Sequence, residues 1–326
     1  MQLPANHWYP VLTTSEVGRK PLGVERLGLR LVFWRDSKGQ VHAAQDRCPH
    51  LGAALSKGQV IDDCLVCPFH GFRFEGSGRC RHAPALGGPP PDALHAHAYP
   101  VQERHGLIWL WWGDAAPSQQ PAFFDELEEG WSHHTIAVDW PVHYTRAIEN
   151  QLDVSHLAFV HRTTIGRGGR SRVEGPHVEA NDTDIRVWVT NRRDDGSAAR
   201  TAAQLAAAAQ GRMPSLHFRF PGVWLLNISP TFRNFIAFVP INEHCTRYYL
   251  RSYMRWRMPV IAPLAHWLLS WSNRFILNQD RRVVITQPQG SSLEAKDDHL
   301  LGSDAAIVAF RRVLTRQAAE QLQSRR

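Results

Sequence analysis

Two short loops in the first quarter of the chain restrict its fold more than any other feature. One loop reads Cys48-Pro49-His50-Leu51-Gly52, and the other reads Cys67-Pro68-Phe69-His70-Gly71. The proline and glycine of each loop shape it so that backbone amides turn inward towards the sulfur atom. Each loop offers one thiol and one imidazole, and both groups bind metal ions in proteins. The two loops together therefore predict a metal centre with two cysteine and two histidine ligands.

This ligand set suits more than one kind of centre. In a Rieske [2Fe–2S] cluster, two cysteines hold one iron and two histidines hold the other, which raises the reduction potential above that of an all-cysteine cluster. Zinc also accepts two cysteines and two histidines, and Cys64 and Cys67 form a C-x-x-C pair. Paired Cys-Pro loops at this spacing are not a usual zinc arrangement. The pattern therefore favours a Rieske cluster with Cys48, His50, Cys67 and His70 as ligands.

Composition narrows the function classes. The chain has five cysteines, and its first residues lack the apolar segment of a secretory signal, so metal ligation is expected rather than disulfides. We expect Cys64, Cys80 and Cys245 to be small buried residues. The formal charge is +7, but the basic residues are dispersed, which argues against nucleic-acid binding and is more compatible with an acidic redox partner.

The most apolar stretch, residues 259–277, bears on the location of the protein. Pro263, His266, Asn273 and Arg274 interrupt it, and its uninterrupted part is shorter than the roughly 20 residues that a bilayer requires. We expect a buried helix here, without membrane contact, and a cytoplasmic protein.

Residues 1–116 predict a small all-β domain, because their apolar runs are short and turn residues separate them. Strands are expected at 7–12, 27–34, 40–44, 60–61, 65–66 and 107–112. Residues 80–95 are rich in proline and glycine and predict a surface loop. Residues 117–134 predict a linker, and its acidic run at 125–129 predicts a solvated face.

Residues 135–326 predict an antiparallel sheet with long helices packed on it, so the whole chain is expected to be α+β. Strands are expected at 135–140, 185–190, 215–220, 223–228, 234–239 and 246–256. A loop rich in glycine and arginine is expected at 166–175, and residues 198–210 fit either a short helix or a loosely ordered insertion. Long helices are expected from Pro259 to about Thr286 and from the N-cap pair Ser303-Asp304 onward.

A second group of polar side chains lies at the start of this part, within residues 148–161. Asp153 and His156 are three positions apart, so a helix places them on one face. His161 follows five positions later and does not align with them, so the helix loosens near its end or His161 sits just past it. Apolar packing is expected from Leu152, Leu157, Phe159 and Val160.

Two histidines and a carboxylate are the ligands of a facial-triad Fe(II) site, which keeps positions open for oxygen. From these residues alone, a buried helix with two hydrogen-bonded histidines and a capping aspartate is the simpler interpretation.

With both groups of residues in place, the whole chain resembles the oxygenase component of Rieske non-haem iron oxygenases, in the branch of monooxygenases and demethylases. The resemblance implies one Rieske cluster in the first domain and a helix-grip (START-like) catalytic domain with one mononuclear Fe(II). It also implies that Asp280, in Asn278-Gln279-Asp280-Arg281, completes His156 and His161 as the third ligand, with Glu149 as the alternative. Without the resemblance, Asp280 would be expected to pair with a neighbouring arginine.

The same resemblance implies partners. Electrons come from NAD(P)H through a separate flavin reductase or ferredoxin, and the cluster of one subunit supplies the iron of its neighbour in a head-to-tail homotrimer. Asp153 matches the carboxylate that bridges a cluster histidine, His70, to an iron histidine, His156. Asn150 either lies close to the iron or bonds to the backbone of its own helix.

The expected reaction is hydroxylation or oxidative demethylation of a small aromatic or heterocyclic substrate by a terminal oxygenase. Ring cis-dihydroxylation is the first alternative. A Rieske electron carrier without oxygen chemistry is the second, and the ligand set of the second iron argues against it. Candidate pocket walls, which the sequence alone assigns more readily to plain core, are Phe218, Phe220, Trp224, Phe232 and Phe235.

Overall fold

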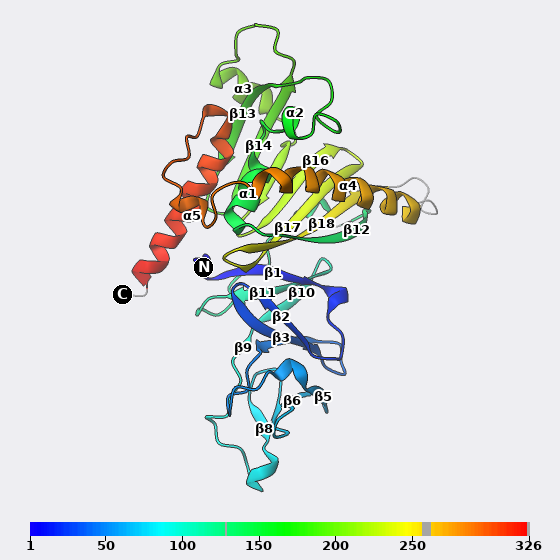
Figure 1. The fold of residues 1–326 in the computed structure, drawn as a ribbon, viewed down its shortest axis with the longest axis vertical. Helices are drawn as coiled ribbons and strands as arrows, with labels where there is room; N and C mark the ends of the chain where they lie inside the picture. Colours follow the sequence, from blue (N-terminus) through cyan, green and yellow to red (C-terminus); the bar gives the residue numbers. More distant parts are fainter. Residues whose placement is uncertain (128, 256–261, 325–326) are drawn as a thin grey trace. The chain divides into compact units, whose positions relative to one another are not determined.

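A computed structural model describes residues 1–127, 129–255 and 262–324 (Figure 1). The chain divides into two compact units, Leu3–Pro121 with Met1, and Ala122–Arg326 with Gln2. Trp256 and Pro259, where we expect a strand to end and a helix to begin, lie outside the described ranges. The structure confirms the α+β class, with an all-β first unit and an antiparallel sheet carrying helices in the second.

The first unit consists of three small antiparallel sheets, because turns interrupt its apolar runs every few residues. One sheet has the order β1 (His7–Thr13), β11 (Leu107–Trp112), β10 (Val101–Arg104). The second has the order β2 (Leu22–Arg26), β3 (Leu29–Arg35), β4 (Val41–Gln45), β9 (Ala98–Tyr99). The third has the order β5 (Gln59–Ile61), β6 (Cys64–Val66), β7 (Arg73–Phe74), β8 (Cys80–His82). The expected surface loop at 80–95 therefore begins with a strand.

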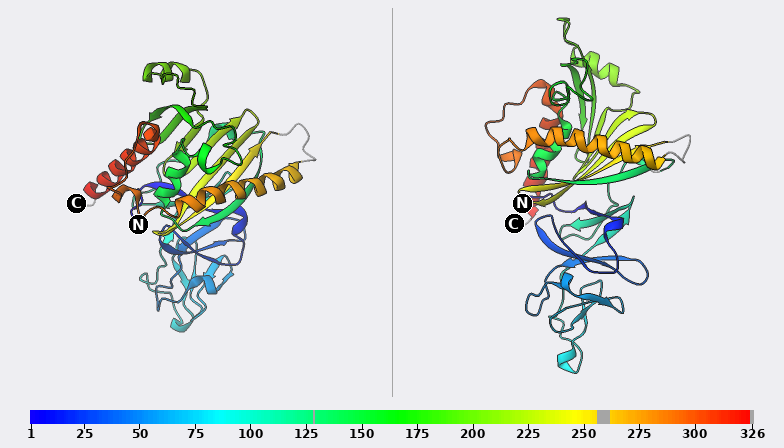
Figure 2. Two further views of the ribbon diagram at one scale, coloured as in Figure 1. Left: turned by 45° about the horizontal axis from the view of Figure 1, so that its top comes forward. Right: turned by 45° about the vertical axis from the view of Figure 1, so that its right-hand side comes forward.

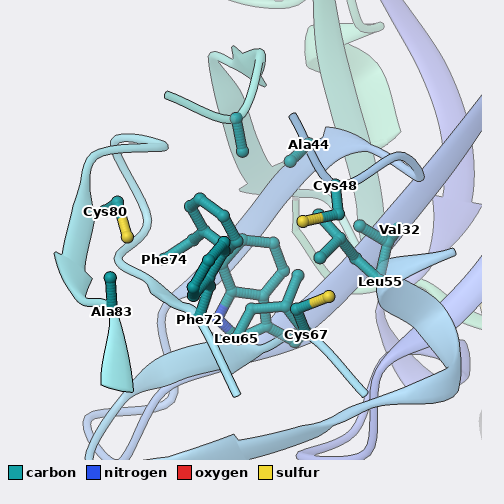
Figure 3. Packing of buried hydrophobic residues seen from close by; sticks show 12 residues of the cluster. Val32, Ala44, Cys48, Leu55, Leu65, Cys67, Phe72, Phe74, Cys80 and Ala83 are labelled. Carbon is teal, nitrogen blue, oxygen red and sulfur yellow. The ribbon is translucent and has the colours of Figure 1, made fainter. Parts of the chain in front are cut away.

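A compact apolar cluster lies beneath the two Cys-His loops (Figure 3). Leu55 and Leu65 are fully buried, and Phe72 and Phe74 fill the centre. Cys48 and Cys67 lie at one side of this cluster and Cys80 at the other (Figure 3). Side chains packed this closely hold the loop backbones in place, which a cluster site requires.

The second unit has one seven-stranded antiparallel sheet in the order β12-β18-β17-β16-β15-β14-β13. The strands are β12 (Ser132–Trp140), β13 (Arg172–Ala180), β14 (Asp184–Arg192), β15 (Leu216–Arg219), β16 (Val223–Ser229), β17 (Phe232–Asn242) and β18 (Cys245–Met254). The helices are α1 (Tyr144–Leu152), α2 (Leu157–Val160), α3 (Ala202–Ala209), α4 (Ala262–Val284) and α5 (Ala305–Ser324). Figures 1 and 2 show α1 and α4 lying across the same face of the sheet.

The strand register explains which side chains meet these helices. Phe218 pairs with Trp224 across β15 and β16, and successive pairs carry the same face on to Leu250 of β18. Phe218 contacts Phe310 of α5, with ring centroids 5.6 Å apart, so this is the face that the helices cover. Residues one position away point to the opposite face. On that opposite face, the Phe235 ring contacts the ring of Phe124, which lies in the segment before the sheet begins.

Several expected boundaries move. β12 begins inside the stretch that we expected to be a linker, and Leu127 of the expected solvated run is buried. The expected loop at 166–175 ends earlier, because β13 begins at Arg172. The open question at 198–210 is answered by helix α3. Thr201 caps this helix. Its hydroxyl accepts a hydrogen bond from the backbone N–H of Gln204, and the Gln204 side-chain oxygen accepts one from the backbone N–H of Thr201.

The expectation of a buried helix over residues 259–277 is wrong for the described part, α4. Trp267 and Trp271 are 59% and 69% exposed, and the buried positions of this stretch include the polar residues His266 and Asn273 as well as Leu277. The Asn273 side chain donates to the Ser252 hydroxyl at 2.6 Å, and both residues are buried. A buried polar residue of the sheet thus favours a buried polar residue on the helix at this point. No helix in the described ranges is long and apolar enough to cross a membrane.

Candidate metal centres

The two Cys-His loops fold in the same way. In the first, the Cys48 amide donates to the Ala53 carbonyl at 2.8 Å, and the Gly52 amide donates to the Cys48 carbonyl at 2.9 Å. The corresponding amides of Cys67 and Gly71 make the same bonds in the second loop, at 2.8 and 3.0 Å. Gly52 and Gly71 have φ values of +76° and +71°, a conformation that strains other residues. Glycine is therefore required at the end of each loop.

The four predicted ligands of the first centre come together at these loops. Cys48 and Cys67 are each 2% exposed, whereas the His50 and His70 rings are exposed and lie 4.9 Å apart. Burial raises the pKa of the Cys48 thiol to about 11, so this thiol needs a bound cation to become a thiolate. Buried sulfur and exposed imidazole fit a cluster with its cysteine-bound iron inside and its histidine-bound iron at the surface. All five cysteines are free, and Cys245 is half-buried rather than buried.

The segment that carries the second group folds as two short helices instead of one. α1 stops before Asp153, whose carboxylate accepts the Ser155 amide at 2.6 Å, and such local bonds compete with helix continuation. His156 precedes α2, and His161 follows it directly. The helical face that we expected for Asp153 and His156 is therefore wrong, although their side chains still meet at 3.5 Å. The position of His161 just past a helix is confirmed.

Helix α4 brings a carboxylate to the two histidines. Asp280 Oδ1 lies 3.0 Å from His161 Nε2 and 3.5 Å from His156 Nε2. The three side chains can each offer one ligand atom, and these atoms all lie within 4.8 Å of one another. Asp280 is 3% exposed, and its Oδ1 makes no well-aligned hydrogen bond in the described chain. A buried carboxylate oxygen without a hydrogen-bond donor is costly, and a cation bound beside it would remove that cost.

The electrostatics of the group point in the same direction. Burial lowers the pKa of His161, but the contact with the Asp280 carboxylate outweighs it, and the net pKa is raised. The carboxylate thus attracts positive charge to the His161 ring. Two neutral imidazoles and one carboxylate are the donor set that suits non-haem Fe(II).

Asp153 lies at the open side of this group. Its side chain is 29% exposed. Burial raises the pKa of its carboxyl group, but the contact with His156 lowers this pKa by more, so the net pKa lies below the ordinary value. Asp153 is therefore ionised at neutral pH. Asn150 is half-buried and accepts a hydrogen bond from the Gln151 side chain at 2.8 Å. Its role near the iron stays a prediction.

Two residues of the same segment differ from expectation. Glu149, the alternative ligand, is buried but pairs with Arg311, whose Nε lies 2.7 Å from Glu149 Oε1. Ser292 donates to the same carboxylate oxygen at 2.5 Å. Phe159 was expected to pack against the site, but it is 67% exposed, because the short helix α2 turns this position to solvent.

The candidate pocket walls separate onto the two faces of the sheet. Phe218 and Phe220 pack against Phe310 in the core, and Phe235 lies on the face opposite the helices. These positions are therefore structural. Trp224 lies on the helix-covered face, and its buried indole N–H has no hydrogen-bond partner among the described residues. A role of Trp224 as a pocket wall stays a prediction.

One residue beside the metal group was absent from the sequence-based set. Gln279 is 5% exposed, and its amide oxygen lies 2.9 Å from His161 Nδ1. The only sequence signal for Gln279 was its position directly before Asp280. Two consecutive residues of a helix can contact the same neighbouring side chain from different sides, as Gln279 and Asp280 contact His161.

Two family models match the chain. The Rieske [2Fe-2S] domain matches residues 7–100, and the vanillate O-demethylase oxygenase C-terminal domain matches residues 140–320, more than half of the 326 residues.

Relatives and solved structures agree with these matches. Chlorophyllide a oxygenase of Chlamydomonas reinhardtii is 37% identical over 165 residues, which are 50% of this chain and 25% of the relative. The oxygenase component of dicamba O-demethylase from Stenotrophomonas maltophilia is 35% identical over 179 residues, 53% of this chain and 52% of the relative. The chain thus spans about half or less of these curated relatives. A crystal structure of dicamba monooxygenase bound to dicamba is 25% identical, with a TM-score of 0.80 and full coverage of both chains. The two domain matches show that the chain belongs to the family of oxygenase components that join a Rieske [2Fe–2S] domain to a vanillate O-demethylase-type C-terminal domain.

Proposed function

We propose that this chain is a terminal oxygenase component that hydroxylates or oxidatively demethylates a small organic substrate. The observation that carries the proposal is the convergence of His156, His161 and Asp280 from two distant segments into one buried, metal-competent group. When bound, a [2Fe–2S] cluster supplies single electrons and a mononuclear iron supplies oxygen activation. An electron carrier needs only the first of these sites.

The residues of the chain divide the work. Cys48, His50, Cys67 and His70 would hold the cluster, with the exposed imidazoles at the edge where a partner makes contact. Asp153 remains ionised, with Oδ2 facing His156 Nδ1 and Oδ1 accepting the Ser155 amide, so a second imidazole would bond to a remaining lone pair of this partly exposed carboxylate.

We assign that second imidazole to His70 of a neighbouring subunit, in a head-to-tail homotrimer. The support is the exposure of both groups: His70 is exposed in the first unit, and Asp153 is partly exposed in the second. A closed ring is the ordinary way to satisfy such a head-to-tail contact. Electrons would come from NAD(P)H through a separate reductase or ferredoxin, in the cytoplasm.

The relatives favour removal of a methyl group from an aromatic or heterocyclic compound, because one of them is a dicamba O-demethylase. Ring cis-dihydroxylation remains the alternative. Labelling with ¹⁸O₂ separates the two reactions, since a dihydroxylated product keeps both oxygen atoms and a hydroxylated or demethylated one carries at most one.

Metal analysis tests the proposal directly. We expect three irons per chain, two from the cluster and one from the mononuclear site. Two irons per chain would instead indicate an electron carrier. Oxygen consumption with a surrogate reductase, across aromatic acids, methoxyarenes, sulfonates and N-methyl alkaloids, then identifies the substrate class. The Asp280→Ala protein gives the background rate of the cluster alone.

A further inference from the structure

We propose that Gln279 is a positioning residue that keeps the ring proton of His161 on Nδ1 and so presents Nε2 to the mononuclear metal. The inference rests on the proposed metal site of His156, His161 and Asp280. Gln279 is not one of these three residues, and its side-chain oxygen contacts the ring nitrogen of His161 that lies away from Asp280. Its role would be to set which atom of His161 is available.

His161 is contacted at both ring nitrogens by consecutive residues of one helix. Its Nδ1 lies 2.9 Å from Gln279 Oε1, and its Nε2 lies 3.0 Å from Asp280 Oδ1. The residue is 1% exposed, so water does not replace either contact. An imidazole that binds a metal through Nε2 carries its hydrogen on Nδ1 and needs an acceptor there. The amide oxygen of Gln279 is that acceptor.

The Gln279 amide is itself held from two sides. The Thr164 hydroxyl donates to the same Oε1 at 2.9 Å, and the amide nitrogen donates to the Thr163 hydroxyl at 3.3 Å. These bonds oppose a rotation that would turn the NH₂ group towards the ring. A donor at Nδ1 would move the ring proton to Nε2 and remove the ligand atom.

The loop that supplies these hydroxyl groups is tightly closed. The Gly166 amide donates to the His161 carbonyl at 3.0 Å, and a Cβ on Gly166 would lie 1.9 Å from the Leu157 carbonyl oxygen. A larger residue at this position would therefore displace the loop. The positions of Thr163, Thr164 and the His161 backbone are thus fixed together.

The two histidines differ in the charge of their outer partners. His156 Nδ1 faces Asp153, an ionised and partly exposed carboxylate, at 3.5 Å. His161 Nδ1 faces a neutral amide in the interior. A carboxylate at this second place would add another buried negative charge close to Asp280. An amide supplies the acceptor without that charge.

Equilibrium metal binding tests the assignment without reference to turnover. The full-length protein, with its cluster intact and the mononuclear ion removed, is titrated with Co²⁺ by calorimetry. Gln279→Met keeps the length of the side chain but removes the acceptor, and we expect about 10- to 100-fold weaker binding. Gln279→Glu keeps an acceptor at Nδ1, so it should not weaken Co²⁺ binding, while its additional buried negative charge should lower the stability of the metal-free protein.

Thr163→Val is the matched control, because it removes only the longer bond of the amide nitrogen, while the Thr164 hydroxyl still donates to Oε1 and keeps that oxygen on the ring. Its affinity should equal that of the wild type. Cluster absorbance checks the folding of each variant, and Gln279→Leu is a second acceptor-free variant should Gln279→Met not fold. Wild-type affinity in the acceptor-free variant, or an equal loss in Thr163→Val, would overturn the role. Failure of the wild type to bind Co²⁺ would overturn the metal site itself, together with the role of Gln279.

Discussion

The Glu149→Gln substitution should destabilise the catalytic unit without removing the mononuclear metal. Glu149 was the alternative metal ligand, but its carboxylate accepts two hydrogen bonds from Arg311, at 2.7 and 3.0 Å. Arg146 Nη1 lies 3.6 Å away on the same helix, and Asp298 contacts both arginines at 2.7 and 2.6 Å. The buried group therefore contains two carboxylates and two guanidinium groups. It links helix α1, which leads to the metal segment, to helix α5.

The magnitude follows from this balance of charge. Replacing Glu149 with glutamine leaves two guanidinium groups opposite one carboxylate, and the side chains of Arg146 and Arg311 are only 6% and 16% exposed. Removal of one partner from a buried ion pair costs about 3–5 kcal/mol, because the remaining charge is uncompensated. For a unit of this size, 1 kcal/mol lowers Tm by roughly 2–4 °C. We therefore expect a decrease in Tm of roughly 6–20 °C.

Urea unfolding followed by tryptophan fluorescence measures the change, and iron analysis of the folded protein measures the metal. The Glu149→Gln/Arg311→Gln double variant leaves Arg146 with Asp298 and should recover a large part of the loss. Glu179→Gln makes the same substitution in an exposed pair with His177 and should cost at most about 1 kcal/mol. A Glu149→Gln protein of wild-type stability that lacks mononuclear iron would refute the reasoning and make Glu149 a ligand.

Three further predictions concern single residues. Asp280→Ala should lose the mononuclear iron and retain the visible absorbance of the cluster; full iron content would remove Asp280 from the ligand set. Asp153→Asn should keep both metals and stop turnover, because an amide has a single acceptor oxygen and its NH₂ group only donates, and normal turnover would contradict the bridging role. Burial lowers the pKa of His143, the N-cap of α1, from 6.5 to about 4. The folded protein therefore holds this ring neutral at pH values where the unfolded chain protonates it. The stability contributed by His143 is complete above pH 6.5 and is lost as the pH falls towards 4. The loss should reach up to about 3 kcal/mol, and Tm measured at pH 7 and pH 5 should depend less on pH in His143→Asn, which retains a capping side chain.

Local patterns allowed the sequence to predict the two loops of the first candidate centre and the four side chains that they bring together. The ligands of each loop lie within four positions, and proline and glycine determine the turn around them, so no long-range contact is needed. His156 and His161 also lie close together in the sequence, but their local pattern alone did not distinguish a metal site from a buried helix. The break between α1 and α2 could not be predicted, because neither proline nor glycine marks it. The Asp153 carboxylate ends the helix by accepting the Ser155 amide.

Features that depend on strand register or on helix rotation could not be predicted. Phe218 and Phe235 lie in strands of similar composition, but the pairing places them on opposite faces of the sheet. The rotation of α4 departs from hydrophobic patterning at two positions, although Leu277 and Val284 of the same helix are buried. Its polar Asn273 faces the sheet while Trp271 faces outward, because the sheet offers the buried hydroxyl of Ser252 at that point.

The interpretation of Asp280 depends on both the local sequence and the long-range contacts of the fold. In the sequence, Asp280 stands directly before Arg281 and Arg282, and pairing with an arginine is the simplest interpretation of such a pattern. Only the family resemblance pointed to a ligand. In the structure, Asp280 instead faces His156 and His161, at 3% exposure. A carboxylate that is buried against two imidazoles, in a chain rich in arginine, would be costly without a cation. The arrangement is therefore explained by a metal ion that replaces the missing charge.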